Sequence, residues 1–231
     1  MKLLLDREFS GPTFGLYKRM LRRMVRATDP YHPVEFQGRR LAEGQRGCSD
    51  RWAAIKSQIE AHGAETLLDL GCAEGYFVRS AAVECGCVAL GVDADLRRLT
   101  LAESFSTLDR VQGAGFMLAE LTPALLQKLP RFDLVVFLSV MHHIMYECGV
   151  DHAREIAALV RSKTNKVLIF DMGQSDETEH EWAGALPDMG ADPHAWIREF
   201  LLSAGFSSVD KLAETDSYQG HVRRAVFAAR P

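Results

Sequence analysis

Short apolar runs alternate with segments of helical pattern from residue 66 to the end of the chain. The runs predicted to form strands cover residues 66–70, 88–92, 115–118, 134–138, 167–171, 207–212 and 222–228. The segments predicted to form helices between them cover residues 76–84, 96–104, 151–160 and 193–204. Strand–helix alternation at this spacing predicts a parallel sheet with helices on both faces.

The last two predicted strands have no helix between them. A polar stretch, residues 213–221, joins them instead, so they are expected to pair as an antiparallel hairpin at the sheet edge. The predicted fold class is therefore α/β, with a seven-stranded, mostly parallel sheet, helices on both faces and a C-terminal antiparallel hairpin.

Two further helices are predicted ahead of the sheet. In residues 14–27, apolar positions 14, 16, 17, 20, 21, 24 and 25 alternate with basic positions 18, 19, 22, 23 and 26. Such a helix could lie on an anionic membrane, cover an active site, or dock on the domain with its basic face in solvent. Ser49–His62 is the second helix, with Ser49 or Asp50 as its cap and Gly63 as its end. We divide the chain into a basic helical N-terminal extension, residues 1–62, and a domain formed by residues 63–231.

Composition and charge narrow the class of protein. Apolar residues make up 47% and charged residues 25%, which is a globular balance. Charge interrupts the first six residues too soon for a secretory signal, and five cysteines without a metal-like spacing indicate reduced thiols. These features predict a cytoplasmic protein, with residues 14–27 as an optional contact with the inner membrane face. The net charge is −4, but residues 1–60 hold twelve Lys and Arg against seven Asp and Glu, so the extension would meet any polyanion.

A glycine-rich turn follows the first predicted strand. Asp69 ends that strand, and Gly71-Cys72-Ala73-Glu74-Gly75 comes next, where ligands of open α/β sheets bind. Asp93 ends the second strand, where a carboxylate can accept protons from both hydroxyls of a ribose. The Gly-x-Gly-x-x-Gly pattern of dinucleotide sites is absent, which disfavours NAD and favours S-adenosylmethionine (SAM). A plain tight turn is the alternative.

This pair of motifs resembles motif I and the following acid of class I SAM-dependent methyltransferases, which have a Rossmann-like sheet ending in a hairpin. The resemblance implies that the turn holds the methionine part, Asp93 the ribose, Glu120 and Leu121 the adenine, and Leu138 and Ser139 the sulfonium region. The cofactor-binding residues expected on this basis are Asp69, Gly71, Cys72, Ala73, Gly75, Phe77, Asp93, Ala94, Glu120, Leu121, Leu138 and Ser139.

Two adjacent histidines, His142 and His143, follow the fourth strand. The Asn/Asp-Pro-Pro-Tyr/Phe and Pro-Cys motifs of DNA base methyltransferases are absent there. A histidine can take the proton of a hydroxyl acceptor, or in its protonated form hold an anion such as phosphate. Packing alone is the remaining option. We expect one imidazole in the site and one supporting it, and no metal, because beyond Glu147 no third ligand is evident.

A narrower resemblance rests on two strings and a tyrosine. The strings are Leu138-Ser139-Val140-x-His142-His143-Ile144 and Arg46-x-Cys48-x-x-Arg51, and Tyr31 stands fifteen residues before Arg46. They resemble the methyltransferase domain of bacterial O-antigen chain terminators, which methylate a terminal phosphate of a polysaccharide. The resemblance implies that Tyr31 and Arg51 reach the cofactor, Arg51 by pairing with its carboxylate, and that His142 and His143 lie at the acceptor. The 231 residues include no kinase domain, which leaves the acceptor open between a phosphate and a hydroxyl.

The leading hypothesis is a SAM-dependent methyltransferase acting on an oxygen of a glycan, glycolipid or small metabolite. An RNA or tRNA methyltransferase, served by the basic extension, is the second hypothesis, and a non-catalytic binding protein of the same fold is the third. Residues 171–191 form a long connection that contains Trp182 among acidic residues. We interpret it as a lid or acceptor-binding loop, with a solvated loop as the alternative.

Overall fold

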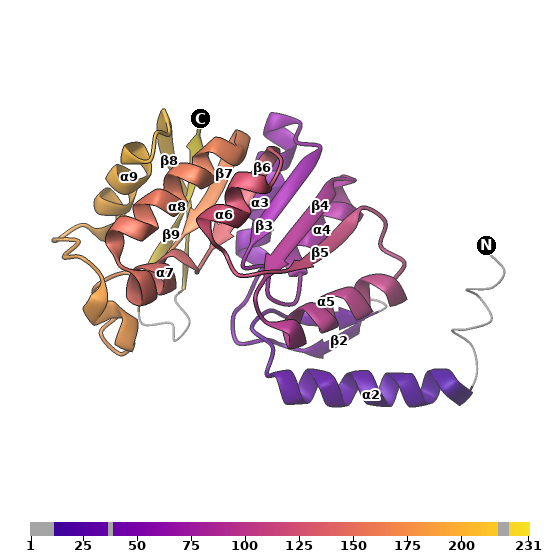
Figure 1. Cartoon of the computed structure of the whole chain (residues 1–231). Coiled ribbons are helices and arrows are strands. Elements are labelled where there is room, and N and C mark those ends of the chain that lie inside the picture. The colour runs from indigo at the N-terminus through magenta and orange to yellow at the C-terminus, as the bar shows by residue number, and fades with distance from the viewer. Residues whose placement is uncertain (1–11, 37–38, 217–221) are drawn as a thin grey trace.

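The computed structural model describes residues 12–36, 39–216 and 222–231 (Figure 1). The first six residues, which the sequence analysis excludes as a secretory signal, lie outside this part. So do residues 217–221 of the polar connection between the last two strands.

A seven-stranded sheet forms the centre of the molecule, in the order β5-β4-β3-β6-β7-β9-β8 (Figure 1). The strands are β3 Thr66–Leu70, β4 Val88–Asp93, β5 Ala114–Leu118, β6 Phe132–Leu138, β7 Thr164–Asp171, β8 Ser208–Asp216 and β9 Arg223–Arg230. The first five are parallel, whereas β9 is antiparallel to both β7 and β8. The predicted mostly parallel sheet with a C-terminal antiparallel hairpin is confirmed.

Helices cover both faces of the sheet. They are α3 Ser49–His62, α4 Tyr76–Cys85, α5 Leu96–Leu108, α6 Pro123–Lys128, α7 Met141–Cys148, α8 Val150–Lys163 and α9 Pro193–Ser203, with a 3₁₀ turn η1 at Glu181–Ala185. The side chains of Asp95, Thr122 and Asp192 cap three of them by accepting backbone N–H bonds. Three short helical elements were not predicted from the sequence: α6, α7 and η1, each of at most eight residues.

Alternation along the strands divides the apolar core into two layers. Leu68, Val135 and Phe170 face the layer that includes α6, α7, α8 and α9. Their neighbours Leu67, Val136 and Ile169 face the layer that includes α3 and α4. This period of two is what a sheet buried on both faces requires.

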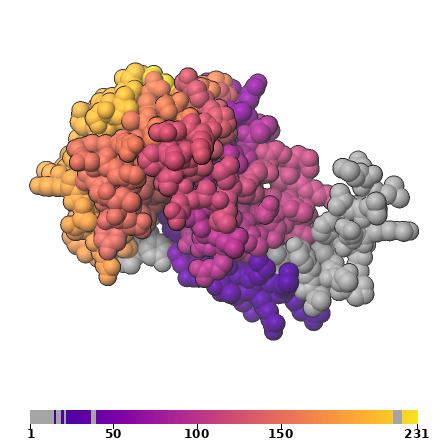
Figure 2. All heavy atoms as spheres, in the orientation of Figure 1, coloured from indigo at the N-terminus to yellow at the C-terminus, as the bar shows by residue number. Residues whose placement is uncertain are grey.

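The N-terminal extension contributes a helix and a small hairpin. Helix α2, Pro12–Thr28, lies against α5, and its N-terminal end extends beyond the body of the domain (Figure 1). The indigo atoms at the lower surface of the molecule in Figure 2 belong to the later part of this helix. Val25 packs with the antiparallel pair β1 Val34–Phe36 and β2 Arg39–Ala42 on Phe105 and its neighbours. The exposed arginines of α2 are Arg19, Arg22, Arg23 and Arg26. Contact of this helix with a membrane stays a prediction, and no helix of the described segments is long and apolar enough to span one.

Helix α3 belongs to the core of the sheet. Its Trp52, Ile55 and Ile59 are buried in the second layer. Cys48 precedes the helix and makes no side-chain cap, so the predicted cap at Ser49 or Asp50 is wrong, because both residues already lie inside the first turn. Gly63 ends the helix in a left-handed conformation, as predicted. The division of the chain at residue 62 stays a prediction.

Gly91 in β4 and Gly115 in β5 offer a matched test of packing. A methyl group on Gly91 would lie 2.6 Å from Sγ and 2.9 Å from Cβ of Cys72, whereas the nearest atom to one on Gly115 is 3.9 Å away. We expect Gly91→Ala to lower the free energy of unfolding by about 1–3 kcal/mol and Gly115→Ala to change it little. Urea denaturation followed by circular dichroism measures both, and equal effects would contradict the close packing at Gly91.

Candidate functional site

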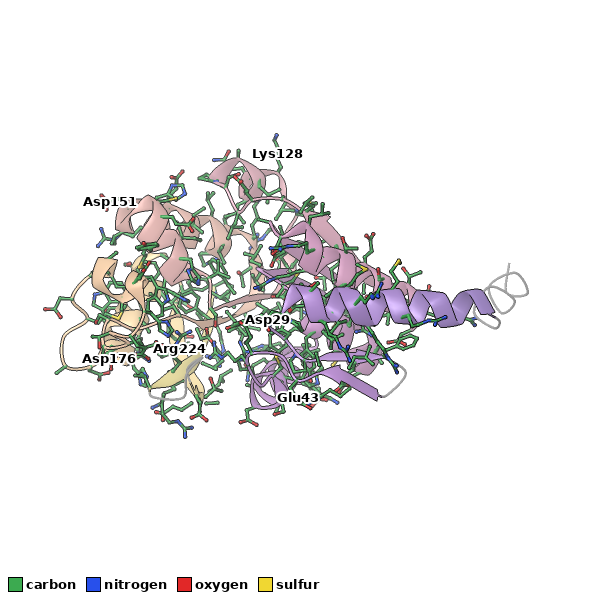
Figure 3. All side chains as sticks on the ribbon, turned by 90° about the horizontal axis from the view of Figure 1, so that it is seen from below. Asp29, Glu43, Lys128, Asp151, Asp176 and Arg224 are labelled. Atoms are coloured by element: carbon green, nitrogen blue, oxygen red, sulfur yellow. The ribbon has the colours of Figure 1, made fainter. Side chains whose placement is uncertain are left out.

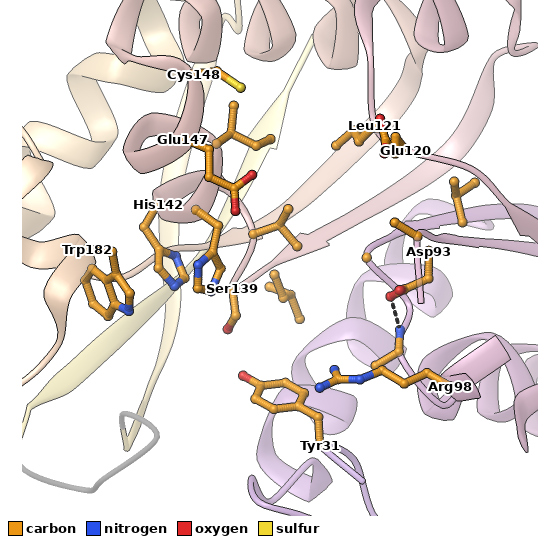
Figure 4. Close-up of a pocket in the computed structure, with 18 of the residues that line it drawn as sticks. Tyr31, Asp93, Arg98, Glu120, Leu121, Ser139, His142, Glu147, Cys148 and Trp182 are labelled. Carbon is orange, nitrogen blue, oxygen red and sulfur yellow. Dashed lines mark hydrogen bonds between the residues drawn. The ribbon is translucent and has the colours of Figure 1, made fainter. Parts of the chain in front are cut away.

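A pocket of about 680 Å³ opens at the carboxyl ends of the parallel strands (Figure 4). Its size is in the range of small-molecule sites. Eleven predicted site residues line it: Tyr31, Gly71, Ala73, Asp93, Ala94, Glu120, Leu121, Leu138, Ser139, His142 and His143. The other five, Arg51, Asp69, Cys72, Gly75 and Phe77, do not line it, and all five are buried.

The glycine turn between β3 and α4 needs both of its glycines. Gly71 and Gly75 have φ angles of +79° and +72°, a region that side chains disfavour. A Cβ on Gly71 would lie 2.4 Å from Cγ2 of Val140, and one on Gly75 would lie 2.5 Å from the Phe116 ring. The turn therefore lies directly against the segment that follows β6, and the pocket opens beside this contact.

Asp93 is held in a fixed orientation at the pocket wall. One carboxylate oxygen accepts the N–H of Ala73 at 2.8 Å, and the other accepts the N–H of Asp95 at 2.8 Å. A carboxylate oxygen can accept more than one hydrogen bond, so both remain able to receive ribose hydroxyls. The carboxylate also ties the glycine turn to the start of α5.

Behind the glycine turn, Asp69 and Arg51 are buried with unsatisfied polar atoms. Among the described residues, Oδ2 of Asp69 and the Nε and Nη1 atoms of Arg51 have no hydrogen-bond partner. Arg51 uses Nη2 for the carbonyl of Gly47, and its guanidinium lies 5.4 Å from the centre of the Phe77 ring. Burial and the nearby Asp93 raise the pKa of Asp69 to about 8, although Arg51 opposes them.

Arg46 connects the extension to the far side of the pocket, and the sequence analysis did not place it in the site. Its guanidinium donates to the Tyr31 hydroxyl at 3.3 Å, to Asp171 at 3.4 Å and to the Ser139 hydroxyl. Arg46 and Asp171 are both buried, and the guanidinium helps to hold the pKa of Asp171 below its usual range against the effect of burial. The sequence offered only the Arg-x-Cys-x-x-Arg string as a signal, because the partners are about a hundred residues apart.

Ser139 adopts a strained backbone conformation at the end of β6. Its φ is +59°, which is uncommon outside glycine. One oxygen of Asp171 accepts both its N–H, at 2.7 Å, and its hydroxyl, at 2.9 Å. These bonds hold the strand end beside Leu138 in the middle of the pocket wall.

Glu74, inside the glycine turn, positions Tyr31. Its two carboxylate oxygens accept the backbone N–H groups of Tyr31 at 3.1 Å and His32 at 2.9 Å. Burial would raise the pKa of Tyr31, but the nearby Arg46 and Arg51 lower it overall. Tyr31 thus enters the pocket from the extension, while Arg51 stays behind it.

The two histidines differ in their surroundings. His142 is buried, its Nδ1 accepts the N–H of Gly173 at 3.0 Å, and its ring lies 4.4 Å from that of Trp182. Since Nδ1 accepts a bond, the proton of the neutral ring is on Nε2. His143 is exposed to the pocket, and the two ring centres are 4.2 Å apart. Burial lowers the pKa of both, and lowers that of His142 well below 6.5.

Residues 171–191 form a packed segment that contributes His180 and Trp182 to the pocket wall. Trp182 stacks on His180 with ring centres 5.0 Å apart, and the Arg224 guanidinium lies 5.5 Å from its ring. Both oxygens of buried Glu177 accept bonds of 2.7 Å from Arg224, which lies inside the molecule, whereas Asp176 lies at its edge (Figure 3). The alternative of a solvated loop is therefore wrong, since Trp182 and Glu177 are buried, whereas closure as a lid stays a prediction.

Within the described residues, one group of side chains has the proximity of metal ligands. Ligand atoms of Glu177, Glu179 and His180 lie within 4.8 Å of one another. The oxygens of Glu177 are already used by Arg224 and by the N–H of Gln174. A buried carboxylate with these partners is a structural ion pair, so the group carries no metal assignment.

The chain is similar in sequence to a curated methyltransferase/kinase. The chain is 25% identical over 191 residues to the O-antigen chain terminator bifunctional methyltransferase/kinase WbdD of Escherichia coli, an alignment covering 80% of this chain and 25% of the relative. It therefore spans about a quarter of the length of the curated relatives it matches. No family model matches the chain.

Solved structures agree with this similarity. The bifunctional kinase-methyltransferase WbdD superposes with a TM-score of 0.75 at 23% identity, over 91% of this chain and 46% of that one. The chain has a methyltransferase fold. The N-terminal domain of EvdMO1, in the presence of SAH and D-fucose, superposes with a TM-score of 0.65 at 22% identity, over 93% and 96% of the two chains. The resemblance to chain-terminator methyltransferases is confirmed, as is the Rossmann-like architecture.

Gly173 provides a test of the wall formed by Trp182. A methyl group on Gly173 would lie 2.3 Å from the Trp182 ring and 3.0 Å from Cγ of His142, whereas nothing lies within 4 Å of one on Gly184. We expect Gly173→Ala to lower the free energy of unfolding by about 1–3 kcal/mol and to displace the indole. Gly184→Ala is the control, and urea denaturation is the measurement. A Gly173→Ala protein as stable as the control would contradict the contact.

The burial of His142 predicts a pH effect on stability. The unfolded chain takes up a proton at His142 near its ordinary pKa of about 6.5, whereas the folded protein does so only at much lower pH. Stability from this residue is therefore present above pH 6.5 and is lost as the pH falls below it. The free energy of unfolding of the wild type, relative to His142→Gln, should decrease by about 1 kcal/mol between about pH 7.5 and pH 5.5. A difference that does not change with pH would show that the folded ring takes up a proton as readily as the unfolded one.

Proposed function

We propose that this protein is a SAM-dependent methyltransferase that transfers the methyl group to an oxygen of a glycan, glycolipid or small metabolite. The observation that carries the proposal is the conjunction, in one pocket, of the glycine turn, the fixed Asp93 and the histidine pair. The similarity to WbdD and the SAH in the EvdMO1 structures support the same class of reaction.

The chemistry of the buried donors fits the methionine part of SAM. That part is a zwitterion, and Arg51 and Asp69 offer an unsatisfied guanidinium and an unsatisfied carboxyl oxygen behind the glycine turn. An ammonium group beside Asp69 would favour the ionised form of this carboxyl. We assign Arg51 to the carboxylate and Asp69 to the ammonium. A buried charge without a partner is costly, so a ligand that satisfies both residues gains their electrostatic energy on binding.

The remaining cofactor residues follow the length of the pocket. Asp93 would hold the ribose, Glu120 and Leu121 the adenine, and Leu138 and Ser139 the region next to sulfur. Bound SAM supplies a methyl group on a positively charged sulfur. Ser139, fixed by Asp171 and Arg46, sets the position of that end of the pocket, and Tyr31 closes it from the extension.

The acceptor would enter on the side of His142, His143 and Trp182. The glycan class comes from the relatives, one described as an O-antigen chain terminator and another studied with D-fucose. Action on RNA has only the exposed arginines of α2 in its favour. A cytoplasmic location, with contact between α2 and a membrane, remains part of the proposal.

Calorimetry with SAM and SAH tests the proposed function. We expect binding in the micromolar range, and Asp93→Ala should weaken it at least about tenfold because two hydrogen bonds to ribose are lost. Glu103→Ala removes the same charge from the exposed face of α5 and serves as the control. A wild-type protein that binds neither compound would overturn the proposal.

A further inference from the structure

We propose that the acceptor side of this pocket takes a neutral hydroxyl and discriminates against a phosphate monoester, with His143 receiving the hydroxyl proton. The inference rests on the proposed methyl transfer and names the substrate class of the same site. It departs from the phosphate acceptor that the resemblance to chain terminators implies.

The only guanidinium on the acceptor wall, within the described residues, is already neutralised. Arg224 donates two bonds of 2.7 Å to Glu177, and both side chains are buried. This is a bidentate ion pair, and a guanidinium can bind a phosphate in the same bidentate way. For Arg224 to bind a phosphate, Glu177 would lose its charged partner in a buried position, which is strongly unfavourable.

Other guanidinium groups near the pocket are also close to carboxylates. Arg46 lies behind Ser139 and pairs with Asp171 at 3.4 Å, and Arg98, at the cofactor end, lies 3.9 Å from Glu74. Five charged side chains line the described pocket: Asp93, Glu120, Glu147, Arg98 and Arg224. Acids outnumber bases among them, and Glu147 lies next to the histidines (Figure 4). A phosphate monoester, which carries close to two negative charges, would therefore be repelled by the net negative charge of the pocket lining.

The histidine pair suits a hydroxyl. The N–H of Gly173 occupies Nδ1 of His142, so the neutral ring has a proton on Nε2 and can donate a bond but cannot accept a proton there. His143 has no such bond and faces the pocket, with Glu147 one helical turn further on. The two rings therefore have different roles: His142 donates a hydrogen bond that orients the acceptor oxygen, and His143 accepts the proton.

The transfer balances with these groups alone. The acceptor oxygen forms a bond to the methyl carbon while the methyl–sulfur bond breaks and its electron pair returns to sulfur. The hydroxyl proton passes to His143, which becomes positively charged as the positive charge on sulfur disappears. An ionised phosphate oxygen carries no proton, so methyl transfer to it would not need His143 as a base.

Binding of methyl phosphate to the SAH-loaded protein tests the inference without needing the natural acceptor. The histidine ring signals are followed by NMR at slightly alkaline pH, with His143→Gln used to assign His143. We expect no saturable shift of the His143 signal in the wild type. Saturable binding of methyl phosphate or inorganic phosphate at His143 would overturn the inference. Failure of SAH to bind would instead overturn the proposed function, so the two failures are distinguishable.

A variant tests the role of the Arg224–Glu177 pair. Glu177→Gln removes the negative charge and leaves Arg224 uncompensated, so methyl phosphate should bind this variant saturably at concentrations at which the wild type shows no saturation. Glu181→Gln, an exposed acid of the same segment, is the matched control and should leave binding unchanged. A folded Glu177→Gln protein without this gain would overturn the role given to the pair, and if the variant does not fold, the wild-type measurement decides.

Discussion

The buried ion pair between Arg46 and Asp171 is the constraint on which the site depends. Two charges removed from water are stable only when they are paired and hydrogen-bonded, and here each has further partners. Arg46 also bonds Tyr31 and Ser139, while Asp171 bonds the backbone and hydroxyl of Ser139. The strained strand end and the segment before α3 are therefore fixed by the same pair, and the pocket lies between them.

A second buried carboxylate, that of Glu74, joins two segments in the same way on the glycine-turn side of the pocket. Glu74 belongs to the glycine turn, yet it binds the backbone of Tyr31 and His32 in the extension. The same glycine turn is bound to Asp93, whose carboxylate accepts the backbone N–H of Ala73. Tyr31, Asp93 and Ser139 are thus held by hydrogen bonds to neighbouring groups before any ligand binds, and such preorganisation is what positioning a methyl donor requires.

The sequence predicted the elements that follow local rules and missed those that depend on distant partners. The seven strands along the chain, the terminal hairpin and the glycine turn follow from alternation and from backbone demands that residues such as Gly71 reveal locally, whereas the order of the strands in the sheet was not predicted. Eleven predicted residues line the pocket, but Arg51 lies behind it, and Arg46, Glu74 and Arg224 were not placed in the site. Their roles depend on bonds across long stretches of chain, which no periodicity shows. Helix α7 escaped prediction because its eight residues give too short a pattern.

The separation of these partners has a consequence for the order of events during synthesis. The bonds of Arg46 reach across 93 residues to Ser139 and 125 residues to Asp171, and those of Arg224 reach back 47 residues to Glu177. Until the ribosome has released β7, the guanidinium of Arg46 has no carboxylate to meet. The first parallel strands can pair earlier, since their contacts are more local. The pocket is therefore among the last features to form on the nascent chain, and the wall that faces the acceptor is complete only once Arg224, in the final strand, has emerged.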